Sequence, residues 1–183
     1  DFVSGAERAN KAGFDIIGAI GDDAAYIFER QNGTWVQTSK LTGSDVDVGD
    51  RFGYSVSISG DTVIVGSPRD DTNGGVRAGS AYIFQKVGGT WSQSARLVAL
   101  DGVDDDEYGW SVSVSGLRCV VGSPSGDIGE GAPGGWESDT GTAYVYENRN
   151  GAWIEDSKLT PSHTTSQARF GESVVIDGDQ LLI

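Results

Sequence analysis

Carboxylates gathered in two short, glycine-containing segments are the residues of this chain best suited to chemistry. The segments are Asp101-Gly102-Val103-Asp104-Asp105-Asp106-Glu107 and Asp70-Asp71-Thr72-Asn73-Gly74. Calcium prefers several carboxylate and carbonyl oxygens from a flexible loop, so both segments predict a calcium site, although neither matches a full EF-hand loop. The candidate ligands are Asp101, Asp104, Asp105, Asp106, Asp70, Asp71 and Asn73.

A structural role is the alternative for the same carboxylates. Asp50 and Asp106 stand at equivalent places before an aromatic-Gly pair, where an aspartate can cap the turn into a strand. The remaining acids would then form a solvated surface. The third equivalent segment, residues 161–168, contains no acid, which argues against a calcium site in every copy.

Catalytic chemistry finds little support in the sequence. Nucleophilic catalysis of the Ser/Cys-His kind needs a positioned histidine, and the only one, His163, lies in a Ser/Thr-rich spacer. Cys119 stands where the preceding copy has Val63, which predicts a small buried hydrophobic side chain. A G-x-G-x-x-G motif at residues 129–134 lies in a long loop rather than between a strand and a helix. A carboxylate pair for glycoside hydrolysis stays open, but no pair stands out, so we predict a protein that is not an enzyme.

A block of about 56 residues occurs three times along the chain, and these groups lie within its copies. The segment RFGYSVSISGDTVIVGSP (51–68) returns as EYGWSVSVSGLRCVVGSP (107–124) and as RFGESVVIDGDQLLI (169–183). A second segment, AYIFERQNGTWVQTSKL (25–41), returns at 81–97 and 143–159. Only the junction after Gly-Ser-Pro varies in length, so variation is confined to one kind of loop.

Within each block the hydrophobic pattern has a period of two, which predicts strands rather than helices. In the second copy the predicted strands cover residues 52–59, 62–65, 81–86 and 90–98. Gly60-Asp61 joins the first two strands. Two-residue turns with positive φ join the third and fourth strands of the three copies, at Asn32-Gly33, Gly88-Gly89 and Asn150-Gly151.

Four antiparallel strands per repeat predict an all-β fold of β-propeller blades, because a small sheet with two apolar faces must stack on neighbours to bury them. The predicted units are a partial, degenerate first blade (1–50), a second (51–106), a third (107–168) and the truncated start of a fourth (169–183). Large aromatic side chains are expected to pack between blades. They are Tyr26, Tyr82 and Tyr144 in the third strands and Trp35, Trp91 and Trp153 in the fourth.

The repeats resemble the FG-GAP repeats of integrin-α-type β-propellers, in a secreted-type variant with a Trp…Lys/Arg-Leu fourth strand. The resemblance rests on Phe52-Gly53 with Gly66-Ser67-Pro68, on Tyr108-Gly109 with Gly122-Ser123-Pro124, and on Phe170-Gly171, and covers the chain from about Gly13 onward. It implies a propeller in extracellular or cell-surface proteins that adhere, bind ligands or build structure. The Asp-x-Asp-x-Asp-Gly calcium loop of integrin-like repeats is missing, since Ser59-Gly60-Asp61 stands in its place.

About three and a half blades cannot close a ring, and closure is how a propeller protects its sheet edges. We therefore expect a piece of something larger. Flanking blades could complete the ring, or neighbouring copies could pair edge to edge into an oligomer or filament. No apolar run is long enough to span a membrane.

The chain has a net charge of −14, from 27 acidic and 13 basic residues, and this charge limits the kinds of molecule that it can bind. It argues against nucleic acid, whose phosphates need a basic face, and favours cations or basic partners. In an up-down blade the two-to-three loops and the blade-to-blade spacers share one side, and most of the acids fall there. Variable loops on a rigid scaffold are where recognition usually resides.

We therefore predict a non-enzymatic extracellular or cell-surface module for adhesion, protein interaction or structural assembly through its acidic long-loop face. The alternatives are a carbohydrate-binding propeller, with Trp136 as a stacking platform, and an accessory domain of a secreted hydrolase. Expected partners are other blades or neighbouring copies, and a protein or glycan ligand. Asn32-Gly33-Thr34 is a glycosylation sequon on a predicted hairpin, with Asn32 as acceptor.

Overall fold

The computed structural model describes residues 14–19, 23–126, 139–163 and 167–183, in which strands alternate with turns and loops. Two sheets have four antiparallel strands in sequential order. The first is β4 (Ser55–Ser59), β5 (Thr62–Ser67), β6 (Ser80–Val87) and β7 (Thr90–Leu97), and the second is β8 (Ser111–Ser115), β9 (Arg118–Ser123), β10 (Thr142–Arg149) and β11 (Ala152–Leu159). The prediction of an all-β fold with four antiparallel strands per repeat is confirmed.

A smaller sheet lies at each end of these two. Before them comes a three-stranded sheet of β1 (Phe14–Ala19), β2 (Ala24–Gln31) and β3 (Thr34–Leu41). After them comes the hairpin of β12 (Val175–Asp177) and β13 (Gln180–Leu182). In the described part of the chain we find no helix that could cross a membrane.

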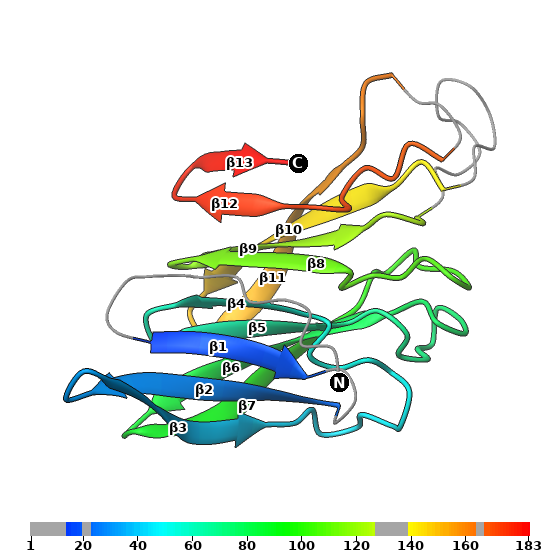
Figure 1. Cartoon of the computed structure of the whole chain (residues 1–183). Coiled ribbons are helices and arrows are strands. Elements are labelled where there is room, and N and C mark those ends of the chain that lie inside the picture. The colour runs from blue at the N-terminus through cyan, green and yellow to red at the C-terminus, as the bar shows by residue number, and fades with distance from the viewer. Residues whose placement is uncertain (1–13, 20–22, 127–138, 164–166) are drawn as a thin grey trace.

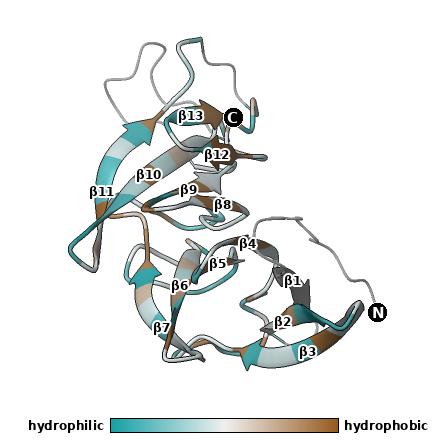
Figure 2. Cartoon of the chain, turned by 90° about the vertical axis from the view of Figure 1, so that its left-hand side faces the viewer, coloured by the Kyte–Doolittle hydropathy of each residue, from teal (hydrophilic) through white to brown (hydrophobic). Residues whose placement is uncertain are grey.

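The sheets follow one another as blades around an open arc (Figures 1 and 2). The first strands β4, β8 and β12 lie on the inner side of the arc, and the fourth strands β3, β7 and β11 lie on the outer side (Figure 2). The tight turns lie at one end of the blades and the longer connections at the other (Figure 1). We call the second end the long-loop face; it consists of residues 42–54, 68–79, 98–110 and the described parts of 124–141 and 160–172.

The two-residue turns have the backbone conformations that the sequence predicts. In all three turns between third and fourth strands, both central residues have positive φ, as a type I′ turn requires: Asn32 and Gly33 at 50° and 86°, Gly88 and Gly89 at 60° and 86°, Asn150 and Gly151 at 58° and 92°. The prediction of tight hairpins is therefore confirmed at each of these positions.

The first strand differs from the prediction because it begins at Ser55 rather than at Phe52. Gly53 has φ of 90°, and the N–H groups of Gly53 and Tyr54 both donate to the carbonyl of Gly66, at 3.1 and 3.3 Å. Phe52 is nevertheless fully buried, with edge-on ring contacts to Tyr82 and Phe84. The aromatic-Gly pair is thus a turn that inserts its ring into the core.

Each four-stranded sheet buries both of its faces against neighbouring blades. On β5, Ile64 belongs to the core shared with the third blade, whereas Val63 and Val65 belong to the core shared with the first. Trp91 and Trp153 pack against the cores on the side of the preceding blade, as expected for packing residues. Their counterpart Trp35 in the first blade is 45% exposed.

The two halves of the repeated signature meet across the boundary between blades. A Cβ atom added at Gly66, in the Gly-Ser-Pro half, would collide with the carbonyl oxygen of Gly109, in the aromatic-Gly half of the next repeat. Gly122 stands in the same relation to Gly171. Because only glycine allows the two backbones to approach this closely, the signature is an interface between successive blades.

Serines of the inner strands hydrogen-bond each blade to the next. The N–H of Val114 donates to Ser57 Oγ, and the N–H of Ile176 donates to Ser113 Oγ, both at 3.1 Å and both buried. Nearer the tight turns, the N–H of Gly116 donates to Ser59 Oγ at 3.1 Å in an exposed position. The serine-rich pattern of the first strands is thus explained by backbone N–H groups of the next blade.

The Ser57→Ala variant is expected to lower the free energy of unfolding by about 1–2 kcal/mol, because the buried N–H of Val114 then loses its acceptor. The Ser59→Ala variant, at an exposed contact, is expected to stay within about 0.5 kcal/mol of the parent protein. Urea denaturation of both variants checks this. Equal losses would show that burial of the acceptor does not govern the effect.

The third and fourth strands share an irregularity that recurs in every repeat. The register between them shifts between Ile27 and Phe28, between Ile83 and Phe84, and between Val145 and Tyr146. In the first two repeats the unpaired residue opposite the shift is Thr38 or Ser94, whose hydroxyl donates to the carbonyl of Ile27 or Ile83. Such β-bulges increase the local twist of a sheet.

Candidate functional site

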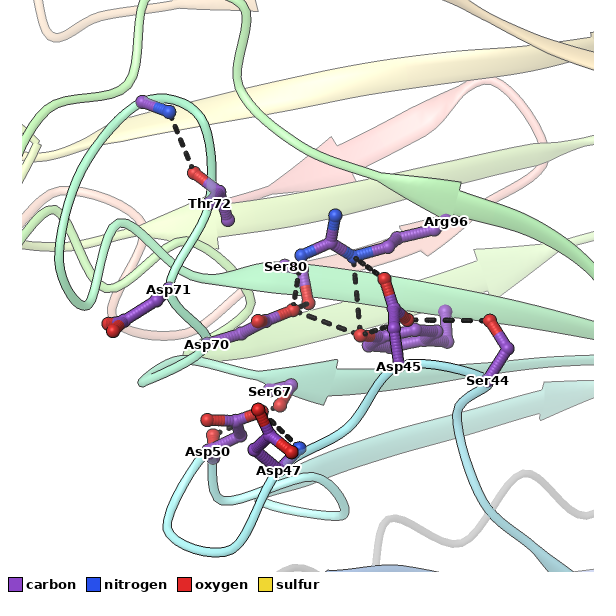
Figure 3. Close-up of polar contacts among 12 residues, drawn as sticks. Ser44, Asp45, Asp47, Asp50, Ser67, Asp70, Asp71, Thr72, Ser80 and Arg96 are labelled. Atoms are coloured by element: carbon purple, nitrogen blue, oxygen red, sulfur yellow. Dashed lines mark hydrogen bonds and ion pairs between the residues drawn. The ribbon is translucent and has the colours of Figure 1, made fainter.

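The long-loop face is hollowed beside the second blade. A pocket of about 520 Å³ opens between the spacer that follows β3 and the loop that joins β5 to β6. Its lining residues are Asp45, Asp47, Val48, Asp50, Asp70, Asp71, Thr72, Asn73 and Arg96. Five of them are aspartates and one is basic (Figure 3). We call this cavity the acidic pocket.

Asp70 is the most buried carboxylate of the acidic pocket, and it is fully engaged in the second blade. Its Oδ2 accepts from the Ser80 hydroxyl at 2.5 Å, lies 2.9 Å from the Tyr82 hydroxyl and accepts from Arg96 at 2.7 Å (Figure 3). Burial lowers the pKa of Arg96, but the hydrogen bond and the charge of Asp70 outweigh this effect, so the pKa is raised. Arg96 is therefore a permanent cation in the wall of the pocket.

Asp45, from the spacer, joins the same network. Its Oδ1 lies 3.0 Å from the Tyr82 hydroxyl, and its Oδ2 lies 3.4 Å from Arg96 Nε. The hydroxyl of Tyr82 has a single proton, so it can donate to Asp45 or to Asp70 at one time. One guanidinium thus neutralises part of the charge of two carboxylates.

The other three carboxylates of the pocket make no ion pair with any residue that the structure describes. Asp50 Oδ2 accepts from the N–H of Asp47 at 2.7 Å, and Asp71 Oδ1 accepts from the N–H of Arg77 at 2.9 Å. Burial raises the pKa of Asp50; the N–H of Asp47 opposes this, but the charges of Asp70, Asp47 and Asp23 raise the pKa further. The acidic pocket therefore contains three carboxylates that have no salt bridge to a described residue.

The third blade repeats part of this arrangement. Asp101 stands where Asp45 does, and it accepts from the Tyr144 hydroxyl at 2.9 Å and from Lys158 Nζ at 2.5 Å. Burial raises the pKa of Asp101, but the hydrogen bonds from Lys158 and Tyr144 and the charge of Lys158 outweigh it, so the pKa is lowered. In both repeats an aspartate of the spacer thus contacts the tyrosine and the basic residue of the following blade.

The buried aspartate Asp70, by contrast, is not repeated. Among the repeats whose structure is described at this position, only the second has an acidic residue there. Gly126 stands at the position of Asp70. The main-chain carbonyl of Asp70 accepts from the N–H of Gly79, and that of Gly126 accepts from the N–H of Gly141, both at 3.0 Å. The hydroxyl of Thr142, the counterpart of Ser80, is buried and has no carboxylate partner among the described residues. The acidic pocket is therefore a feature of one blade rather than of the repeat.

The predicted calcium ligands Asp101, Asp104, Asp105 and Asp106 point to separate partners. Asp104 Oδ1 accepts from the N–H of Val76 at 2.8 Å, and Asp105 pairs with Arg77 at 2.5 Å. Asp106 Oδ2 accepts from the N–H of Val103 at 2.9 Å, as Asp50 does from Asp47, which is the turn-capping role.

The second predicted cluster, Asp70, Asp71 and Asn73, lies along the wall of the acidic pocket. Among the described residues, no three His, Cys, Asp or Glu side chains converge as a metal site needs. Neither cluster, as placed, offers the shell of oxygens that calcium requires. Calcium binding would require these partners to be exchanged, and it stays a prediction.

The remaining predicted residues fall in different surroundings. Asn32 is exposed at the tip of the β2–β3 hairpin. Trp136 lies outside the described residues. Trp110, which also belongs to the long-loop face, is half-buried, with its ring 4.6 Å from that of Tyr54 and 5.3 Å from the guanidinium of Arg169. Trp110 is therefore held by packing between blades.

Arg96, Tyr82 and Ser80 are functional candidates that belong to no sequence motif. Their signal lies in the alignment of the repeats, because a spacer aspartate, a third-strand tyrosine and a fourth-strand Arg or Lys recur together as Asp45, Tyr82 and Arg96 and as Asp101, Tyr144 and Lys158. Recurrence of an acid and a base at fixed positions predicts an ion pair even where neither residue belongs to a known motif.

Comparison with known proteins agrees with the signature residues. The family model described as FG-GAP repeat matches residues 35–84 and 91–146, more than half of the chain. No curated protein matches the sequence. The matched segments cover most of the second and third blades, including the residues of the acidic pocket and the glycines Gly66, Gly109 and Gly122. With its four-stranded blades and its repeated signature, the chain belongs to the FG-GAP repeat family.

Proposed function

We propose that this chain is a non-enzymatic, extracellular interaction module whose long-loop face binds a basic surface of a partner protein. The observation that carries the proposal is the acidic pocket, in which five aspartates surround a single arginine. Asp47 and Asp71 are exposed, and neither makes an ion pair with a described residue. A lysine or arginine of a partner would supply the missing positive charge, and complementary charge of this kind favours specific association.

Two further observations support a binding role rather than a catalytic one. His163 is exposed and lies 3.1 Å from the hydroxyl of its neighbour Ser162, which is also exposed, but no acid among the described residues contacts the ring to orient it, as a catalytic triad requires. Cys119 is buried, and burial raises the pKa of its thiol far above the usual range. A thiol in this state is not a nucleophile at neutral pH.

The test uses a lysine-rich peptide as probe and measures its affinity by calorimetry at rising salt concentration. The variant Asp47→Asn with Asp71→Asn removes two charges from the acidic pocket and preserves the acceptor for the N–H of Arg77. We expect this double variant to bind the peptide about fivefold more weakly, the factor for about 1 kcal/mol of exposed charge pairs. The parent protein should lose affinity as salt rises, because these charges are exposed.

The matched control removes two charges at the opposite end of the blades. Asp61→Asn with Asp177→Asn changes exposed aspartates at tight turns and should leave the affinity unchanged. An equal loss in the control, or an affinity that does not respond to salt, would mean that the peptide senses net charge or apolar surface and that the acidic pocket is not the binding site.

A further inference from the structure

Three Asn-Gly pairs occur in the described chain, at Asn32-Gly33, Asn73-Gly74 and Asn150-Gly151. In such a pair the backbone nitrogen of the glycine can attack the side-chain carbonyl carbon of the asparagine, because glycine has no Cβ to block the approach. The reaction needs that nitrogen free of a hydrogen bond that holds its proton in place. The three pairs differ in this respect.

Two of the glycine nitrogens are engaged. The N–H of Gly151 donates to Asn148 Oδ1 at 2.8 Å, and the N–H of Gly74 donates to Thr72 Oγ1 at 3.0 Å. Asn148 is itself buried, and its own N–H donates to the carbonyl of Leu117 at 2.7 Å, so the acceptor is fixed in position.

The first repeat lacks this protection. Arg30 stands at the position of Asn148, and a guanidinium has no acceptor atom. The N–H of Gly33 has no acceptor among the residues that the structure describes, and both Asn32 and Gly33 are exposed. The backbone conformations of the two turns are otherwise alike, with φ of 50° and 86° at Asn32-Gly33 against 58° and 92° at Asn150-Gly151.

We infer that Asn32 is a site of spontaneous deamidation and that Asn148 protects the equivalent Asn150 from the same reaction. The Gly33 nitrogen loses its proton to water and bonds to Cγ of Asn32, and the Cγ–Nδ2 bond breaks to release ammonia. Water then opens the resulting cyclic imide. If water breaks the bond between the Gly33 nitrogen and Cγ, the product is aspartate. If water breaks the bond between the Gly33 nitrogen and the main-chain carbonyl carbon of residue 32, the product is isoaspartate.

Deamidation would change the hairpin in two ways. It adds a negative charge to a chain that already carries −14, and the isoaspartate product lengthens the main chain within a two-residue turn. It also removes the amide nitrogen to which a glycan on the Asn32-Gly33-Thr34 sequon would be attached. Glycosylation and deamidation of Asn32 therefore exclude one another.

The test is peptide mapping by mass spectrometry of the unglycosylated chain after incubation in mildly alkaline buffer. Deamidation shows as the mass change from amide to acid, and isoaspartate separates from aspartate by chromatography. In the folded protein we expect Asn32 to react about fivefold faster than Asn150 or Asn73, the factor for one hydrogen bond of about 1 kcal/mol. In denaturant the rates of Asn32 and Asn150 should become equal.

Two variants exchange the protection between repeats. Arg30→Asn offers an acceptor to the N–H of Gly33 and should slow Asn32, whereas Asn148→Ala should bring Asn150 up to the rate of Asn32. Arg30 is exposed, so the first variant leaves the core unchanged and remains informative if the second destabilises the blade. Equal rates of Asn32 and Asn150 in the folded parent protein, or no slowing in Arg30→Asn, would overturn the inference.

Discussion

Replacing Gly66 by alanine is expected to lower the free energy of unfolding by about 3 kcal/mol, the upper end of the range for overpacking a dense interior. The added Cβ atom would lie far inside van der Waals contact with the carbonyl oxygen of Gly109 and close to Ser55 Oγ. Both neighbours are fixed, because Ser55 Oγ donates to that same carbonyl at 2.8 Å. The second and third blades must therefore separate to accommodate a methyl group.

Denaturation by urea, followed by tryptophan fluorescence, measures this loss, and Gly60→Ala provides the control. Gly60 has φ of 58°, and its Cβ would meet nothing within 4 Å, so that substitution costs only backbone strain of about 1 kcal/mol. Gly122→Ala should match Gly66→Ala, because its Cβ would collide with the carbonyl of Gly171. A loss at Gly66 no larger than that at Gly60 would show that the blades can move apart at little cost.

The repeats allow the strands and turns to be predicted well, since each of those features depends on local sequence. Alternating side chains and Gly-containing pairs predict hairpins whose central residues adopt positive φ, and Asn32 and Asn150 do so. The start of β4 could not be read in the same way. Phe52 continues the alternation in the sequence, but it belongs to a turn because Gly66 accepts from Gly53 and Tyr54.

Features that depend on how one strand meets another could not be predicted from the hydrophobic pattern. The register shift opposite Thr38 and Ser94 leaves no mark in the hydrophobic pattern, because most side chains of the fourth strand are exposed or half-exposed. In the sequence, the serines of the inner strands form a small polar face. In the structure, Ser57 and Ser113 are buried and accept hydrogen bonds from N–H groups of the next blade. The register shift is decided within one hairpin, whereas the burial of these serines is decided by contacts between blades.

For the candidate site, too, the sequence predicts some features and not others. Clustering of acids on the long-loop face follows from topology and composition, and Asp45, Asp47, Asp50, Asp70 and Asp71 do line one pocket. The partner of each carboxylate does not follow, because Arg96 is 26 positions from Asp70 in the sequence. The acids of residues 101–106 are dense in sequence but bind Lys158, Val76, Arg77 and Val103 separately.

Burial of the Asp70 carboxylate beside Arg96 distinguishes the second blade from the third. Replacing Arg96 by methionine is expected to lower the free energy of unfolding by about 2–3 kcal/mol, because it leaves the Asp70 charge buried with hydroxyl donors alone. The Asp70 side chain is 4% exposed and that of Arg96 is 27% exposed, so solvent reduces the loss below that of a fully buried pair.

The equivalent pair in the third blade supplies the matched comparison. Lys158 and Asp101 have side chains 30% and 54% exposed, and Lys158→Met should cost less than about 1 kcal/mol. Adding Asp70→Asn to Arg96→Met removes the isolated charge and should recover part of the lost stability. Equal losses in the two single variants, or no recovery in the double variant, would show that Arg96 acts by packing against Tyr82 rather than by neutralising Asp70.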